Sequence, residues 1–196
     1  MSALTVLIIR HAEKPDPAKP DLGPGLTPKG VEDKHSLVVR GWQRAGAWAA
    51  LFGANMDRVD YPTPNIVYAA NPDQSSPQDG SHGKRAFETI EPLCKRLHIA
   101  PNITRGIGEE VTLVAEAQQL AGVVLISWEH KRIVENILPE LTKGQMLPHL
   151  PSKWDGDRFD VVLKLDRAQP GAPWSFRQLF PRLLPDDLDT PVGSNE

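Results

Sequence analysis

The chain has 196 residues, of which 40% are hydrophobic and 24% are charged, a composition that is ordinary for a globular protein with one substantial core. Its 22 basic and 25 acidic residues give a net charge of -3, which provides no field to hold a nucleic-acid backbone or a membrane, so we expect a small-molecule partner. A single cysteine, Cys94, excludes an internal disulfide framework, and no apolar stretch could span a bilayer, so we expect a cytoplasmic protein.

Apolar runs alternate with helical patterns along most of the chain. The runs that predict strands are residues 4–9, 65–70, 102–105 and 123–127, and the patterns that predict helices are residues 36–52, 84–97, 109–121 and 131–141. This order is typical of a mainly parallel sheet with helices on both faces. Two stretches rich in Pro, Asp, Gly and Ser, 15–34 and 71–83, follow strands and should overhang the carboxyl ends, where ligands bind in such folds.

The pattern changes toward the C-terminus. Apolar and polar residues alternate over 159–165, and Trp174 and Phe176 follow a Pro/Gly turn, which predicts an antiparallel addition at one edge of the sheet. We therefore expect an α/β three-layer sandwich in which a mainly parallel central sheet carries this edge addition. Residues 1–184 should form a single domain and residues 185–196 a flexible tail.

Charged residues stand where buried strands end. Arg10 and His11 terminate the first strand, His130 follows VVLISWE at the end of another, and Arg85 opens a helix after a third. Parallel strands end at the same edge of a sheet, so we expect these side chains to face one cavity.

Four segments carry a resemblance to a known family. They are RHAEK at 10–14, LVVRGWQRAGAWAALF at 37–52, SHGKRAFET at 81–89 and VVLISWEH at 123–130. They resemble the RHG-type motif, the first helix, the S-x-x-x-R-A-x-x-T element and the second histidine of the histidine phosphatase (phosphoglycerate mutase-like) superfamily. The chain is similar to a small single-domain member.

The resemblance implies a histidine acid phosphatase-like phosphoric monoester hydrolase that needs no metal and no cofactor. His11 would attack phosphorus to give a phosphohistidine that water then discharges. Arg10 and Arg85 would clamp the phosphoryl oxygens, and His130 would add a donor from the far side. The spacing of His11, Glu13 and His130 matches no known metal site.

The resemblance leaves the proton donor for the leaving group open. Some members of the family place an acid directly after the second histidine, but this chain has Lys131 there. Glu109 and Glu110 are the remaining candidates, with Glu13 and Glu129 less favoured, and we favour Glu109. Lys14, Ser81 and Glu110 are candidates for binding the substrate, which we expect to be a small phosphorylated molecule.

Two other interpretations of the same motifs remain open. The chain could be a non-catalytic phosphate-binding or protein-interaction module that kept the pocket, or a phosphoglycerate-type mutase. A phosphatase is favoured over the module because a binding pocket has no need of a nucleophile. It is favoured over a mutase because a mutase must keep water from the phosphoenzyme and the sequence offers no cap domain.

Overall fold

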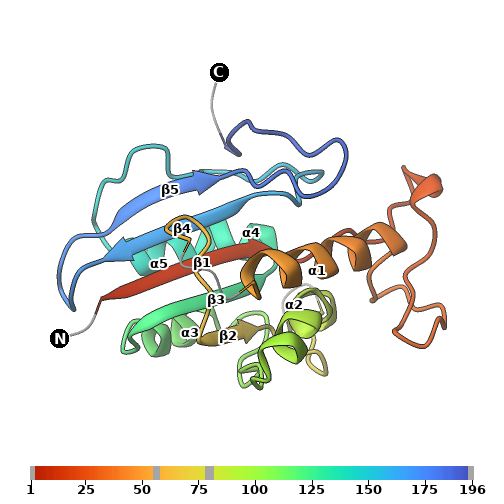
Figure 1. Ribbon diagram of the computed structural model, residues 1–196, viewed down its shortest axis with the longest axis horizontal. Coiled ribbons are helices and arrows are strands. Elements are labelled where there is room, and N and C mark those ends of the chain that lie inside the picture. Colours follow the sequence, from red (N-terminus) through yellow and green to blue (C-terminus); the bar gives the residue numbers. More distant parts are fainter. Residues whose placement is uncertain (1–2, 55–57, 78–81, 194–196) are drawn as a thin grey trace.

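The computed structural model describes residues 3–54, 58–77 and 82–193, and its centre is a five-stranded sheet of order β2-β3-β1-β4-β5 (Figure 1). The strands are β1 (Leu4–Arg10), β2 (Ile66–Ala69), β3 (Gly122–Trp128), β4 (Val162–Arg167) and β5 (Ser175–Leu179). β3 pairs in parallel with β1 and β2, whereas β4 is antiparallel to both β1 and β5. The predicted parallel centre with an antiparallel edge addition is confirmed.

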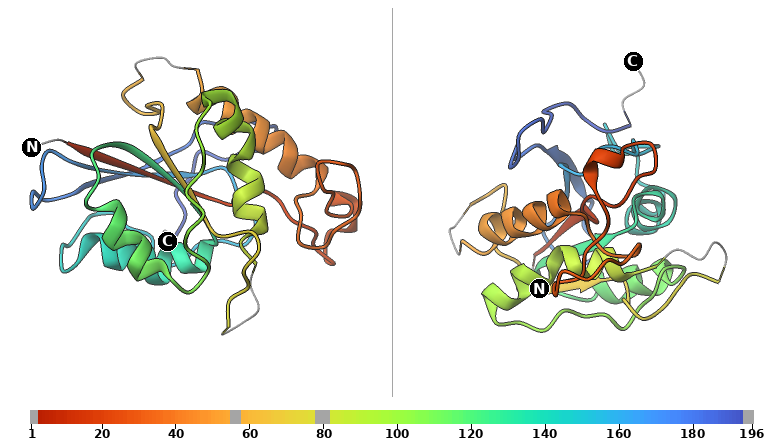
Figure 2. Two further views of the ribbon diagram at one scale, coloured as in Figure 1. Left: turned by 90° about the horizontal axis from the view of Figure 1, so that it is seen from below. Right: turned by 90° about the vertical axis from the view of Figure 1, so that its right-hand side faces the viewer.

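Helices cover both faces of this sheet. They are α1 (Val39–Phe52), α2 (Lys84–Leu97), α3 (Glu110–Ala117), and the consecutive α4 (His130–Arg132), η2 (Ile133–Ile137, a π-helix) and α5 (Leu138–Thr142), with a short η1 (Pro20–Leu22). Figure 2 shows α1 and α2 on one face and α3 with α5 on the other. Within the described ranges, no helix is long and apolar enough to cross a membrane.

β1 is continuously apolar from Val6 to Ile9, a pattern typical of a strand that is buried on both faces. Val6 and Ile8 belong to the core that contains α3 and α5, whereas Leu7 and Ile9 pack in the core that contains Trp48 of α1. The charged end of the strand is therefore carried by a rigid element held on both sides.

Several boundaries differ from the prediction, and the helix expected over 109–121, for example, ends at Ala117. The expected strand at 102–105 is reduced to one bridge between Tyr68 and Asn102. The helix expected from residue 36 begins at Val39. The residues before it, Ser36 and Leu37, instead donate to the buried carboxylate of Glu88, from the Ser36 hydroxyl at 2.8 Å and the Leu37 N–H at 2.9 Å.

Residues 185–193 are the described part of the segment for which we predicted a flexible tail, and two of them have buried contacts with the rest of the chain. Asp187 forms a buried ion pair with Arg44 of α1 at 2.8 Å. Val192 is 1% exposed, and its N–H donates to the side chain of Gln178 in β5 at 2.8 Å. These two contacts hold the segment against α1 and β5.

Candidate active site

The carboxyl ends of β1 and β3 lie side by side and carry the two histidines to one edge of the sheet. Arg10 is in register with Trp128, and the His11 N–H donates to the Trp128 carbonyl at 2.9 Å. His11 therefore leaves the sheet beside the start of α4, where His130 lies. Arg85, in the first turn of α2, lines the same cavity.

This cavity measures about 660 Å³, and polar or charged side chains form most of its wall. The predicted site residues that line it are Arg10, His11, Lys14, Arg85 and His130. Ser81, also predicted, lies outside the described residues. Strand ends and a helix start that are up to 120 positions apart in the sequence thus face one space.

His11 is held as a neutral imidazole. It is 5% exposed, and its Nδ1 lies 2.8 Å from the Ala12 carbonyl, so Nδ1 carries the hydrogen and Nε2 keeps its lone pair. Burial lowers the pKa of His11 well below its usual value, and the charges of Arg10 and Arg85 lower it further. The side chain has the protonation state and tautomer of a nucleophile.

Arg10 is anchored through one nitrogen of its guanidinium, Nη1. Nη1 donates to the carbonyls of Asp155, Gly156 and Arg158 at 3.2, 2.7 and 3.1 Å. The guanidinium lies 3.9 Å from the centre of the Phe159 ring, and its Nε has no partner among the described residues. Burial lowers the pKa of Arg10 to about 10, which leaves it charged at neutral pH.

Arg85 is held by the motif in which it occurs. Its carbonyl accepts a hydrogen bond from the Thr89 hydroxyl at 2.7 Å, and the same hydroxyl accepts from the Ala12 N–H at 2.8 Å. Thr89 thus joins α2 to the residue after His11, which explains the R-A-x-x-T spacing. Arg85 Nη2 donates to the Lys34 carbonyl at 3.3 Å, whereas its buried Nε has no hydrogen-bond partner in the part of the chain that the structure describes.

Glu129 and His130 lie against each other in the cavity wall. Glu129 Oε1 lies 2.6 Å from His130 Nδ1, at an angle that does not make a directed hydrogen bond. Glu129 Oε2 accepts from the Arg132 N–H at 3.0 Å and so caps α4. Burial alone would raise the pKa of Glu129, but His130 and the backbone N–H groups of Arg132 and Lys131 bring it down to about 2.

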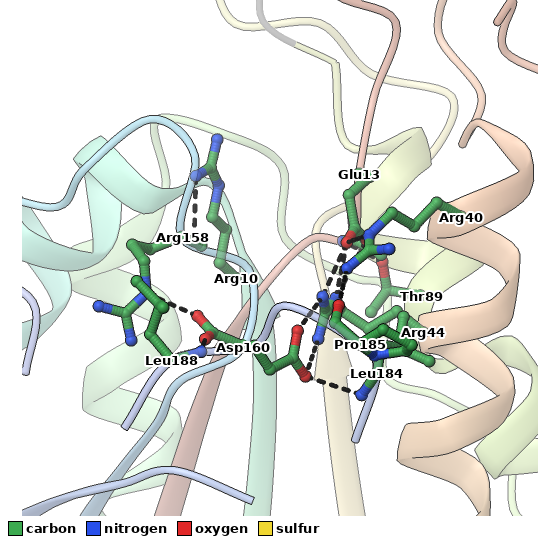
Figure 3. A network of polar contacts seen from close by, with 12 residues as sticks. Arg10, Glu13, Arg40, Arg44, Thr89, Arg158, Asp160, Leu184, Pro185 and Leu188 are labelled. Carbon is green, nitrogen blue, oxygen red and sulfur yellow. Dashed lines mark hydrogen bonds and ion pairs between the residues drawn. The ribbon is translucent and has the colours of Figure 1, made fainter. Parts of the chain in front are cut away.

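Glu13, one of the less favoured acid candidates, is occupied by arginines and does not line this cavity. Its carboxylate accepts from Arg44 Nε at 3.0 Å and from Nη2 at 2.8 Å, and Arg40 Nε lies 3.4 Å away. Figure 3 shows Glu13 facing both arginines beside α1. The glutamate of the RHAEK motif therefore fixes the loop that follows His11.

The two favoured acid candidates, Glu109 and Glu110, also lie outside the cavity wall. Glu109 Oε2 accepts from the Gly106 N–H at 2.7 Å. Glu110 is 3% exposed, and its Oε1 accepts from Trp128 Nε1 at 2.8 Å and from the Gly108 N–H at 2.9 Å. Both carboxylates accept hydrogen bonds near the start of α3, and their roles as proton donor and substrate ligand stay predictions.

Sequence reasoning missed two histidines of the cavity. His35 and His82 line it with their ring centroids 4.0 Å apart, and they come from the ends of the two loops that we expected to overhang the site. Nothing in the loop sequences singles these residues out. No group of three or more His, Cys, Asp or Glu side chains that could hold a metal ion occurs among residues 3–54, 58–77 and 82–193.

A sheet that carries two strand-end histidines and two arginines to one cavity is the arrangement that the motifs predicted for a histidine phosphatase fold. The comparison with solved structures shows this fold. The protein histidine phosphatase SixA, in its complex with tungstate, matches over 90% of this chain and 97% of its own, with a TM-score of 0.52 and 16% sequence identity. No family model and no curated protein matches the chain.

Proposed function

We propose that this chain is a phosphatase that forms a phosphohistidine on His11. The observation that carries the proposal is the buried, neutral His11, whose Nδ1 contacts the Ala12 carbonyl so that Nε2 remains free. Arg10 and Arg85 line the same cavity, and each has a buried Nε without a hydrogen-bond partner among the described residues. A phosphoryl group in the cavity would meet both a nucleophile and unused donors.

In the first step, His11 Nε2 attacks phosphorus, a P–N bond forms and the ester P–O bond breaks. The leaving oxygen takes the electron pair of that bond and requires a proton. In the second step, water attacks the phosphohistidine, inorganic phosphate leaves, and the electron pair of the P–N bond returns to His11. The tautomer of His11 is the same at the start and the end.

Arg10 and Arg85 would supply most of the stabilisation of the transferring phosphoryl group. Charge on its oxygens is the main quantity to be stabilised, and fixed cations that need no reorganisation do so best. Arg10 is fixed by backbone carbonyls and Arg85 by its place in α2. We propose that the reaction needs no metal ion, so turnover should be unchanged by a chelator.

We propose a small phosphomonoester as the substrate, because the cavity wall is polar and a phosphate group would fill its cationic part. The structurally similar SixA is a protein histidine phosphatase, so a phosphohistidine side chain belongs in the substrate panel. SixA was solved in complex with tungstate, a tetrahedral oxyanion like phosphate, so oxyanion binding is a property to test in this chain.

The test is hydrolysis of para-nitrophenyl phosphate by the wild type and by His11→Asn. We expect turnover by the wild type, a loss of at least about 1,000-fold in the variant, and labelled phosphate trapped on the wild type alone. His149→Asn is the matched control, because His149 is exposed and does not line the cavity. Equal turnover by wild type and His11→Asn would overturn the proposal.

A further inference from the structure

Glu109, the proton donor that we favoured from the sequence, does not line the cavity, but other carboxylates do. Those that line it are Asp16, Glu129, Glu135 and Asp157. Asp157 is paired at 2.6 Å with Lys19, a residue that does not line the cavity. Of the four, Glu129 is the one that contacts a second site residue, His130.

Glu129 is fixed rather than mobile. One carboxylate oxygen caps α4 through the Arg132 N–H at 3.0 Å, and the other lies 2.6 Å from His130 Nδ1. The side chains of Glu129 and His130 are 18% and 13% exposed. Because Nδ1 lies against Glu129, Nε2 is the ring nitrogen of His130 that is left for the substrate.

Glu129 itself is a poor proton donor. Its pKa of about 2 means that the carboxyl group is ionised at every pH at which the protein would work. Its partner His130 is a candidate donor, since a charged imidazole is an effective general acid near neutral pH.

We propose that Glu129 and His130 act as a dyad in which the His130 imidazolium gives the leaving group its proton and the Glu129 carboxylate stabilises the charge of that imidazolium. The proposal rests on the phosphohistidine mechanism on His11. In this chain the carboxylate that assists the second histidine would stand directly before it, at Glu129, whereas Lys131 occupies the position after it.

The proton and electron balance closes over the two steps. As the ester P–O bond breaks, the leaving oxygen takes the His130 Nε2 proton and His130 becomes neutral. As water attacks the phosphohistidine, neutral His130 takes a proton from that water and the P–N bond breaks toward His11. Inorganic phosphate leaves, and both histidines return to their starting states.

The test compares Glu129→Gln with wild type on aryl and alkyl phosphates whose leaving groups range from p-nitrophenol to a simple alcohol. We expect kcat/KM to fall by less than about 10-fold for p-nitrophenyl phosphate and by about 100-fold or more for the alkyl ester, because only a poor leaving group needs the proton. Glu135→Gln is the control, since Glu135 lines the same cavity on the same helical segment.

Helix capping is the alternative role of Glu129, and two further variants separate it from the dyad. Asp and Asn cap helices about equally well, but only Asp keeps the charge. Glu129→Asp should therefore retain more of the activity on poor leaving groups than Glu129→Asn at the same melting temperature. This pair also carries the test if Glu129→Gln does not fold.

Failure of the Glu129–His130 dyad can be told apart from failure of the phosphohistidine mechanism on His11. If the wild type hydrolyses p-nitrophenyl phosphate through His11 but the Glu129 variants lose the same factor on every ester, the dyad is overturned and the phosphatase stands. If Glu135→Gln shows the leaving-group dependence instead, the acid is Glu135. If the wild type forms no phosphohistidine, both proposals fail.

Discussion

Arg44 and Asp187, which are 143 positions apart, form a bidentate ion pair in which both side chains are 3% exposed. Arg44 Nη1 and Nη2 donate to the two carboxylate oxygens at 3.1 and 2.8 Å, and Nη2 also reaches Glu13. Burial alone would lower the pKa of Arg44, but Asp187 and Glu13 raise it. The pair thus ties the C-terminal segment to the loop that follows His11.

We predict that Asp187→Asn destabilises the protein by about 1–3 kcal/mol, because a buried charge-assisted contact is lost while Glu13 still pairs with Arg44. Urea denaturation measures the change. Asp189→Asn is the matched control, since Asp189 is 70% exposed and lies 3.7 Å from Arg182, an exposed pair that contributes little. Equal midpoints for Asp187→Asn and wild type would contradict the structural role of this segment.

Arg10 lines the cavity, and its Nη1 donates to three backbone carbonyls, so we expect the rest of its guanidinium to bind the phosphate. A lysine has a single nitrogen, so Arg10→Lys cannot serve both the carbonyls and the phosphate. We predict a loss of about 100-fold or more in kcat/KM and a comparable loss of vanadate affinity.

The control for this variant is Arg96→Lys, because Arg96 also donates to a backbone carbonyl, that of Gly53 at 2.8 Å, but away from the cavity. Its kinetics should match those of the wild type. An Arg10→Lys protein with full vanadate affinity would show that Arg10 only supports the loop around Gly156.

The sequence was enough to predict where the main chain brings chemistry together. Apolar runs that end in Arg10, His11 and His130 are strands in a parallel sheet, and the ends of such strands must meet at one edge. Arg85 lines the same cavity because it lies in the first turn of a helix that follows another strand of the sheet. These are consequences of backbone topology, which hydrophobic patterns encode directly.

The side-chain partners could not be predicted, because they depend on contacts between distant segments. Glu110 opens a helix, as predicted, but its carboxylate turns inward to Trp128, and nothing local distinguishes this from an acid that faces solvent. His35 and His82 meet only because two irregular loops approach each other. Asp187 looks like part of a polar tail until Arg44 is placed beside it.

The placement of Glu109 and Glu110 leads to opposite predictions for the two residues. Glu110→Ala leaves the buried Trp128 Nε1 without its acceptor, so we expect a loss of about 2 kcal/mol in stability. Glu109→Gln keeps an oxygen that can accept from Gly106 and lies outside the cavity, so turnover of an alkyl phosphate should be unchanged. Loss of that turnover in Glu109→Gln would return Glu109 to the role of acid.

The pH dependence of stability offers a test of His11 that needs no substrate. Its pKa in the folded protein is lowered, first by burial and then by Arg10 and Arg85, so the unfolded chain binds the proton more readily. Stability should therefore fall as the pH drops below the unfolded value of about 6.5. The lowered pKa of Glu129 acts in the same direction, but only below pH about 4.5, where an unfolded glutamate takes up its proton.

Urea denaturation at pH 7.5 and 5.5 separates the two windows, since Glu129 stays ionised in both states of the protein over most of this range. We predict that the wild type loses more stability than His11→Asn between these two pH values, because asparagine has no proton to bind. His149→Asn should behave like the wild type, as His149 is exposed. A wild type and a His11→Asn variant with the same pH dependence would mean that folding does not lower the pKa of His11, which would contradict the environment described for this side chain.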